Sequence, residues 1–225
     1  MTDIDVLEAV LHRRHSCRAF RPDPVPQADI ERIVTAAARV PSWCNAQPWQ
    51  VLVTRGPETE RFRAALLETA MSAEPQPDMP WPESYPDAYG SRRRECGFQL
   101  YDAVGIARAD KPGRAAQTMR NYALFDAPHV AIIHSPKVLG PYGAMDTGGF
   151  VTAFTLAATA LGIASIPQAA VAAFAPMIHS HFDIPEDRMI LCAISFGYAD
   201  EDHPANSFRT RRAPLSEVLD TRGDG

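Results

Sequence analysis

Residues 147–182 read TGGFVTAFTLAATALGIASIPQAAVAAFAPMIHSHF, a run of 36 residues without Asp, Glu, Lys or Arg. In its first half, large apolar residues recur at helical spacing, and small residues occupy most of the positions between them. The large residues are Phe150, Phe154 and Leu161, and the small ones are Gly149, Ala153, Ala157, Ala158 and Ala160. This pattern predicts a helix that is buried on nearly all sides and ends at Gly162. A short extended segment then leads to Pro167, Gln168 and Ala169, where backbone groups beside a proline are free to contact a ligand.

A membrane-spanning helix is the other interpretation of a long uncharged run. The run is rich in Ala, Thr and Gly, is interrupted by Gly162 and Pro167, and has no basic flank that would orient it in a bilayer. The N-terminus also lacks the apolar run of a secretory signal, and the four cysteines form no CxxC pair and no short metal-binding spacing. We therefore expect a cytoplasmic protein with reduced thiols, and no membrane partner.

Size and charge exclude several further classes. A chain of 225 residues with 46% hydrophobic residues suits a single domain over residues 1–225. The net charge of -5 argues against a general nucleic-acid binder, so clusters of basic residues are expected to form local anion sites.

Periodic patterns place helices and strands along most of the chain. They predict helices over residues 5–15, 26–39, 58–73, 89–104, 113–125 and 176–182, and strands over residues 50–54, 129–134 and 189–196. Strands interspersed with helices in one domain indicate an α+β fold with a central mixed β-sheet covered by helices.

Two segments fall outside this pattern. Residues 74–86 contain five prolines, which is too many helix breakers for regular structure, so we expect a lid or a disordered excursion within an insert at about 74–94. The chain ends in an arm at about 203–225, and its last apolar pair, Val218 and Leu219, favours docking on another surface.

Basic residues cluster near both ends of the chain. Arg14, Ser16 and Arg18 follow the first helix, and an extended backbone there would send Ser16 and Arg18 to the same side. The other cluster consists of Arg209, Arg211 and Arg212. Together they predict an anion site divided between the two chain ends, although simple solvation remains an alternative for one of the tail arginines.

Other candidate motifs, for a metal, a nucleophile or a nucleotide, each lack a feature that the function would require. His179, His181 and Asp183 resemble a metal-binding HxH motif, but no third motif stands at a recognisable spacing, so no metal is predicted. His15 precedes Ser16 without the GxSxG turn of a nucleophile. Neither a GxGxxG after a strand nor a P-loop is present.

Four segments, in this order, resemble the FMN-dependent nitroreductase family. They are RRHSCRAF (13–20), PSWCNAQPW (41–49), DTGGFVTAFTLAATALGIASIPQA (146–169) and FRTRRAPLSEV (208–218). The segment YGSRRRECGFQLYDAVGIARAD (89–110) is similar to the nitrobenzoate-reductase branch of that family.

The resemblance implies an interlocked homodimer with two FMN sites, each built by both chains. It also implies an NAD(P)H-dependent oxidoreductase, with NADH or NADPH as the electron donor, that reduces nitroaromatic or quinone-like electrophiles by a ping-pong mechanism. Two alternatives remain open: dehalogenation or dehydrogenation of a small substrate on the same fold, and a flavin-binding protein without reductase turnover.

The resemblance also assigns residues to the cofactor. Arg14 matches the phosphate contact, Ser16 a polar contact beside it, and Arg18 the cation near flavin N1 and the C2 carbonyl, with His15 in the same motif. The loop residues matched to the flavin of the other subunit are Pro41, Ser42, Trp43, Asn45 and Gln47. The turn of Pro167, Gln168 and Ala169 matches the backbone near flavin N5, with Ala169 where other members carry Glu. Arg212 matches a second phosphate contact, and Arg209 and Arg211 compete for a further one.

The acceptor substrate is assigned to the insert. Trp81 and Tyr85 offer aromatic walls, and Arg92, Arg93 and Arg94 offer cations for a flat, anionic aromatic such as a nitrobenzoate. Three successive helical residues cannot all face one ligand, so at least one of these arginines is expected to be solvated.

Overall fold

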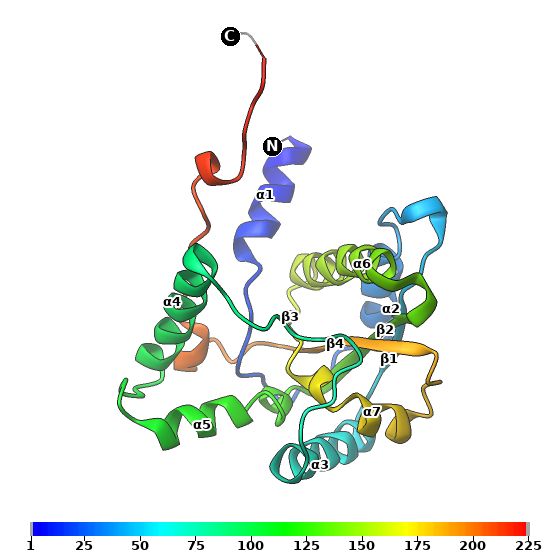
Figure 1. Ribbon diagram of the computed structural model, residues 1–225, viewed down its shortest axis with the longest axis vertical. Coiled ribbons are helices and arrows are strands. Elements are labelled where there is room, and N and C mark those ends of the chain that lie inside the picture. Colours follow the sequence, from blue (N-terminus) through cyan, green and yellow to red (C-terminus); the bar gives the residue numbers. More distant parts are fainter. Residues whose placement is uncertain (1, 224–225) are drawn as a thin grey trace.

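Four antiparallel strands form the central sheet of the computed structural model, which describes residues 2–223 (Figure 1). They are β1 (Gln50–Val53), β2 (His129–Pro136), β3 (Ala164–Gln168) and β4 (Arg188–Gly197), in the order β1-β2-β4-β3. The α+β class is confirmed, but the predicted mixed sheet was wrong, because every pairing between these strands is antiparallel. Hydrophobic periodicity locates a strand and does not encode its direction, which depends on how the connections run.

Seven α-helices surround the sheet in the described residues. They are α1 (Asp3–Arg13), α2 (Gln27–Ala37), α3 (Pro57–Ser72), α4 (Asp87–Ala103), α5 (Lys111–Met119), α6 (Gly140–Ala160) and α7 (Ala175–Phe182). Each was predicted, but α5 ends earlier than the sequence pattern indicated. Leu124, Phe125 and Asp126 adopt positive φ angles of 54°, 51° and 61°, a left-handed conformation that cannot continue a helix.

Helices cover both faces of the sheet. Along β2, Ala131 and Ile133 pack toward α2 and α6, whereas Val130 and Ile132 pack toward α3 and α7. Successive side chains of a strand point to opposite faces, so β2 contributes to two hydrophobic cores and is buried throughout.

The small-residue side of α6 remains open in a single chain. Phe150, Phe154 and Ala158 are buried, but Gly149 and Ala160 are exposed, so burial on nearly all sides would require a second chain over this face. Gly162 ends the helical segment at φ +73°, as predicted. Within residues 2–223, no helix is both long and apolar enough to cross a membrane.

Helix α1 lies outside the sheet layers, next to the C-terminal arm (Figure 1). None of its residues is buried, although Ile4, Leu7 and Leu11 form an apolar face along one side. Their side chains are between 45% and 56% exposed, so α1 presents a hydrophobic surface that its own chain does not cover.

The Pro-rich segment 74–86 has no helix or strand, as predicted, but one part of it is anchored. The carboxylate of Asp78 accepts hydrogen bonds from the Ile190 amide and from His179 Nε2, both at 2.8 Å, and lies 3.0 Å from Lys137 Nζ. Residues 79–89 are exposed. The insert therefore has a fixed first part and an exposed second part.

Candidate active site

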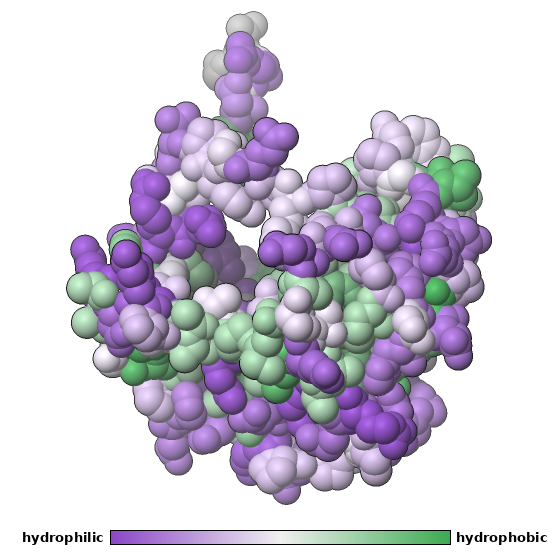
Figure 2. Space-filling view, turned by 60° about the horizontal axis from the view of Figure 1, so that its bottom comes forward, coloured by the Kyte–Doolittle hydropathy of each residue, from purple (hydrophilic) through white to green (hydrophobic). Residues whose placement is uncertain are grey.

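A cavity of about 590 Å³ lies between the end of α1, helix α4 and the arm, and it brings both ends of the chain together. The surface is hollowed between the arm and the body of the molecule (Figure 2). The lining residues are Leu11, His12, Arg14, His15, Ser16, Arg18, Cys96, Phe208, Arg209, Thr210 and Arg212. The structure thus assembles most of the anion site that was predicted from the two ends.

Four arginines of this cavity, Arg14, Arg18, Arg209 and Arg212, have no ion-pair partner among residues 2–223. Burial lowers the pKa of Arg14, and the nearby charge of Arg212 lowers it further. Burial also lowers the pKa of Arg18. Two partly buried cations, Arg14 and Arg18, and two exposed ones, Arg209 and Arg212, without counter-charges among residues 2–223, make a site that favours an anion.

The backbone after α1 explains how the first group of residues is positioned. The helix ends because Arg14 adopts an extended conformation (φ -61°, ψ 122°). Ser16 then forms an isolated parallel bridge with Ser165, and the amide of Cys17 donates to the carbonyl of Ser165 at 3.2 Å. This fixes the segment against β3 and leaves Ser16 and Arg18 on the cavity wall.

Arg18 and His15 are held by local hydrogen bonds. Nη1 of Arg18 donates to the Ser16 carbonyl at 3.2 Å, and its guanidinium lies 5.6 Å from the centre of the Phe208 ring. Burial lowers the pKa of His15, and the charges of Arg209, Arg14 and Arg18 act in the same direction. His15 is therefore neutral at pH 7, and its Nδ1–H donates to the Arg13 carbonyl at 3.0 Å.

The structure separates the two competing tail arginines. Arg209 lines the cavity, and its Nη1 donates to the Asn206 carbonyl at 2.8 Å. Arg211 lies outside it and pairs with Glu95 of α4, with 2.7 Å between Nη2 and Oε1. The geometry places Arg209 rather than Arg211 beside Arg14 and Arg212.

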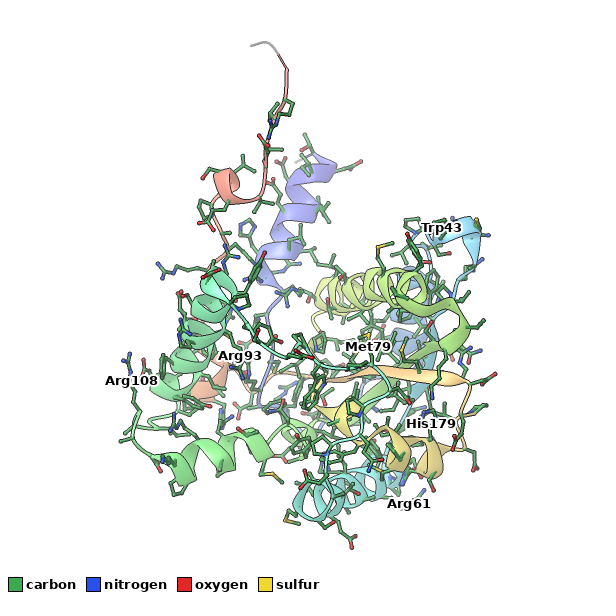
Figure 3. All side chains as sticks on the ribbon, viewed as in Figure 1. Trp43, Arg61, Met79, Arg93, Arg108 and His179 are labelled. Carbon is green, nitrogen blue, oxygen red and sulfur yellow. The ribbon has the colours of Figure 1, made fainter. Side chains whose placement is uncertain are left out.

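The loop of residues 41–47 does not reach this cavity in the same chain. It lies at the N-terminal end of α6, where the Trp43 amide donates to Asp146 Oδ2 at 3.0 Å and the Trp43 ring contacts Tyr142 (Figure 3). The cavity is beside β3, which follows the other end of this 21-residue helix, and such a helix is about 30 Å long.

That loop is tightly turned and exposed. Cys44, Asn45 and Gln47 have positive φ angles of 49°, 57° and 47°, and the Gln47 amide donates to Ser42 Oγ at 2.9 Å. Pro41 is exposed as well. Of its predicted cofactor residues, Pro41, Trp43, Asn45 and Gln47 are therefore exposed and away from their own chain's cavity, whereas Ser42 is half-buried.

The turn after β3 divides its residues between the interior and the surface. The Gln168 side chain is buried, where Nε2 donates to the Asn121 carbonyl at 2.9 Å and Oε1 accepts from Ser195 Oγ at 2.6 Å. Pro167 is half-buried and Ala169 is exposed. The Gln168 side chain thus stabilises the fold, and only the backbone of this turn and Ala169 remain accessible.

The three arginines of α4 point to three different partners. Arg92 pairs with Glu217 of the arm, Arg93 lies 5.3 Å from the Tyr85 ring centre, and Arg94 Nη2 donates to Ser91 Oγ at 3.1 Å. Helical geometry separates them, as expected. Tyr85 and Trp81 are exposed, and Arg93 with Tyr85 is one of two cation–aromatic pairs of the insert, the other being Arg92 with Tyr89 (Figure 3).

The side chains of His179 and His181 also contact different partners. His179 contacts Asp78, whereas His181 Nε2 lies 2.9 Å from Glu58 Oε1 on α3. Among residues 2–223, no three His, Cys, Asp or Glu side chains are arranged to hold a metal ion.

Sequence reasoning missed several residues of the site. Cys96, Phe208 and Thr210 line the cavity, and the buried Asn206 bonds to residues of both chain ends. Thr210 lies in the sequence between Arg209 and Arg211, two predicted site residues, and this position could have indicated that it belongs to the site. Cys96 and Asn206 carried no such signal, because their roles depend on tertiary contacts.

The comparison with known proteins decides the family. The sequence profile of the nitroreductase family matches residues 11–198. This chain belongs to the nitroreductase family. The resemblance inferred from the four motifs is thereby confirmed.

Relatives within this family are similar over nearly their whole length. The chain is 35% identical to the nitroreductase NfnB of Mycolicibacterium smegmatis, covering 94% of this chain and 90% of NfnB. It is 32% identical to a 4-nitrobenzoate reductase of Pseudomonas putida, covering 92% of each. The crystal structure of the FMN-dependent NfnB from Mycobacterium smegmatis in complex with NADPH has a TM-score of 0.93, with 34% identity, and the match covers 98% of this chain and 100% of that one.

Proposed function

We propose that this nitroreductase-family protein is an FMN-dependent oxidoreductase that uses NADPH or NADH to reduce nitroaromatic compounds by a ping-pong route. The observation that carries the proposal is the cavity walled by Arg14, Arg18, Arg209 and Arg212, none of which has an ion-pair partner in residues 2–223. Its similarity to the FMN-dependent NfnB crystallised with NADPH, and to 4-nitrobenzoate reductases, supports this cofactor, donor and acceptor.

The residues of the cavity fit FMN. A phosphate dianion is well matched by the planar, multiply donating guanidinium groups of Arg14 and Arg212, and Arg209 adds a third cation on the same wall. A volume of about 590 Å³ is typical of a site for a small molecule or cofactor. When bound, FMN supplies the redox chemistry, accepting electrons from the nicotinamide and delivering them to the nitro group.

Arg18 provides electrostatic stabilisation rather than proton transfer. Its half-buried guanidinium is held by the Ser16 carbonyl and the Phe208 ring, so little reorganisation is needed when negative charge develops nearby. With FMN bound, Arg18 would supply a fixed positive charge that stabilises negative charge on the reduced flavin. Ala169 carries no titratable group, which leaves water as the proton source at the exposed turn after β3.

A homodimer completes the proposed site. The loop 41–47 presents Trp43 and Asn45 outward, far from its own cavity, which suits contact with the flavin of a second chain. Uncovered apolar surface on α1, the open small-residue side of α6, and the outer edge of β1 all favour coverage by that chain. In this arrangement each subunit supplies the phosphate contacts of one site and the loop of the other.

The acceptor site is assigned to the second half of the insert. Tyr85 and Trp81 supply exposed aromatic surface, and Arg93 supplies a cation that no carboxylate of residues 2–223 neutralises. This combination suits a flat aromatic with an anionic substituent, such as a nitrobenzoate.

An anaerobic two-step experiment tests the function. Adding NADPH to the FMN-loaded protein without oxygen should bleach the flavin far faster than it bleaches free FMN. Adding 4-nitrobenzoate or a quinone should then restore the absorbance, with loss of the acceptor measured by chromatography. A protein that binds FMN but is not bleached by NADPH or NADH would instead be a flavin-binding protein without turnover. Bleaching without consumption of either acceptor would point to dehalogenation or dehydrogenation of another substrate.

A further inference from the structure

Two ion pairs of opposite polarity join the arm to helix α4. On α4, Arg92 and Glu95 are three residues apart and share one face of the helix. On the arm, Arg211 pairs with Glu95, and Glu217 pairs with Arg92. The two surfaces therefore carry complementary charges in a fixed order, and this order sets the register of the arm along α4.

These two ion pairs attach the arm beyond Arg209 to the rest of the chain. Among the hydrogen bonds and ion pairs of residues 210–223, the others join residues close in sequence, such as Arg222 with Asp220. Arg212 itself bonds only to its neighbours, with 2.8 Å between its Nη1 and Thr210 Oγ1. Its own contacts cannot hold it against the cavity.

The contact with α4 lies directly beside the cofactor cavity. Cys96, next to Glu95, and Arg212, next to Arg211, both line that cavity. A second cavity of about 300 Å³ lies between α4 and the arm and shares Cys96, Thr210 and Arg212 with the first. A movement of Arg211 away from α4 would therefore carry Arg212 out of the cavity wall.

We propose that Glu95 is a positioning residue for the cofactor phosphate, acting through Arg211 to hold Arg212 in place. The inference rests on the proposed function, since it takes this cavity as the FMN site. Glu95 would also neutralise Arg211, so the phosphate meets Arg14, Arg209 and Arg212 in a set geometry instead of competing with a mobile fourth arginine.

If Glu95 acted only through its charge, removing its carboxylate would strengthen phosphate binding, which is the opposite of what a positioning role predicts. Glu95 is a negative charge close to a proposed anion site, so neutralising it would strengthen phosphate binding if its only influence were through the local potential. If Glu95 positions the arm, neutralising it weakens phosphate binding. The sign of the change separates the two explanations.

The experiment measures the Kd of FMN and of riboflavin with the full-length apoprotein, from flavin fluorescence at one fixed ionic strength. Glu95→Gln should raise the Kd of FMN about threefold to fivefold, the range expected for an exposed ion pair, and leave the Kd of riboflavin unchanged. Glu95→Arg should also weaken FMN binding, although it adds a positive charge. The double variant Glu95→Arg with Arg211→Glu should recover most of the loss, because the pair is restored with reversed polarity.

The control is Glu68→Gln, which removes the same charge from an exposed residue of α3 that has no ion-pair partner within residues 2–223, and its FMN affinity should equal that of the wild type. Tighter or unchanged FMN binding by Glu95→Gln overturns the inference, and so does an equal loss for FMN and riboflavin, which would indicate general distortion of α4. The Arg14→Ala and Arg212→Ala variants test the proposed phosphate site separately from the positioning role of Glu95. If they too fail to discriminate FMN from riboflavin, the phosphate site itself is misplaced, whereas if they discriminate and Glu95→Gln does not, only the positioning role falls.

Discussion

The side-chain carbonyl of Asn206 accepts a hydrogen bond from the backbone amide of Arg18 at 2.7 Å, across 188 positions of sequence. Asn206 is buried, and its Nδ2 donates to the carbonyls of Ala19 and Asp200. Its own backbone carbonyl accepts from Arg209. One asparagine therefore holds Arg18 and Arg209, one cation from each chain end, in a single arrangement before any ligand arrives, which lowers the ordering cost of binding.

The phosphate role of the cavity predicts a selective loss of affinity. Arg14→Ala and Arg212→Ala should each weaken FMN binding by about tenfold to hundredfold, because each removes a charge-assisted contact of about 1.5 to 3 kcal/mol. Riboflavin lacks the phosphate, so its affinity should change much less. Fluorescence titration of both ligands makes the comparison. Parallel losses for the two flavins would show that these arginines act on the fold and not on the phosphate.

The exposed face of α1 predicts an obligate dimer. Leu7→Glu places a charge within that face and should produce a monomer that no longer retains FMN, measured by sedimentation with absorbance at a flavin wavelength. Ala9→Glu introduces the same residue on the opposite side of the helix and should remain dimeric. A monomeric Leu7 variant that still binds FMN would contradict a site shared between two chains.

The separation of the three arginines predicts which of them recognises the acceptor. Arg93→Ala should raise the KM for 4-nitrobenzoate about tenfold, because it removes an unpaired cation beside Tyr85, and should leave the KM for nitrobenzene unchanged. Arg94→Ala is the matched control, since that side chain bonds within its own helix. Reduction of the flavin by NADPH should be the same in both variants. Equal kinetics of the Arg93 variant with the charged and uncharged acceptors would remove the anionic-substrate proposal and leave the flavoenzyme assignment intact.

Buried histidines predict a loss of stability in mild acid. Burial, together with the charges of Arg188 and His179, lowers the pKa of His134 to about 4. In the unfolded chain this group titrates near 6.5, so between these values the unfolded state binds a proton that the folded state does not. The stabilisation is present above about pH 6.5 and is lost as the pH falls toward 4, by up to about 3 kcal/mol.

Urea denaturation at a series of pH values measures this loss. His134→Asn retains an acceptor for Arg188 Nε, which donates to His134 Nδ1 at 3.0 Å, but has no titrating ring. Its stability should fall less steeply over the same window. A residual slope is expected from His129, whose pKa is also lowered by burial. Superimposable pH profiles of variant and wild type would show that His134 does not carry the effect.

Most helices and strands could be predicted from local signals. The spacing of Phe150 and Phe154 and the position of Gly162 marked α6, and the period of an extended chain placed Ser16 and Arg18 on one side. These features depend on residues close together in sequence. Four motifs in a fixed order then indicated the family, which the profile match to residues 11–198 confirmed.

Other features depend on contacts that no local pattern contains. Strand direction was wrong because alternation is the same in parallel and antiparallel strands. The choice between Arg209 and Arg211 required the position of Glu95, which lies 116 residues away. The periodicity of residues 5–15 predicted the helix α1, but a periodicity cannot distinguish the core of one chain from the surface of a partner.

Asp78 and Gly90 bracket the segment that carries Trp81 and Tyr85. Asp78 is tied to three separate elements of the body, and Gly90 packs so closely that an added Cβ would lie 2.3 Å from the Tyr85 carbonyl oxygen. Between these points the chain is exposed and makes no part of either hydrophobic core. Under the acceptor role proposed for this segment, directed evolution that randomises residues 79–89 should change the range of acceptors and leave the flavin site and the folded body unchanged.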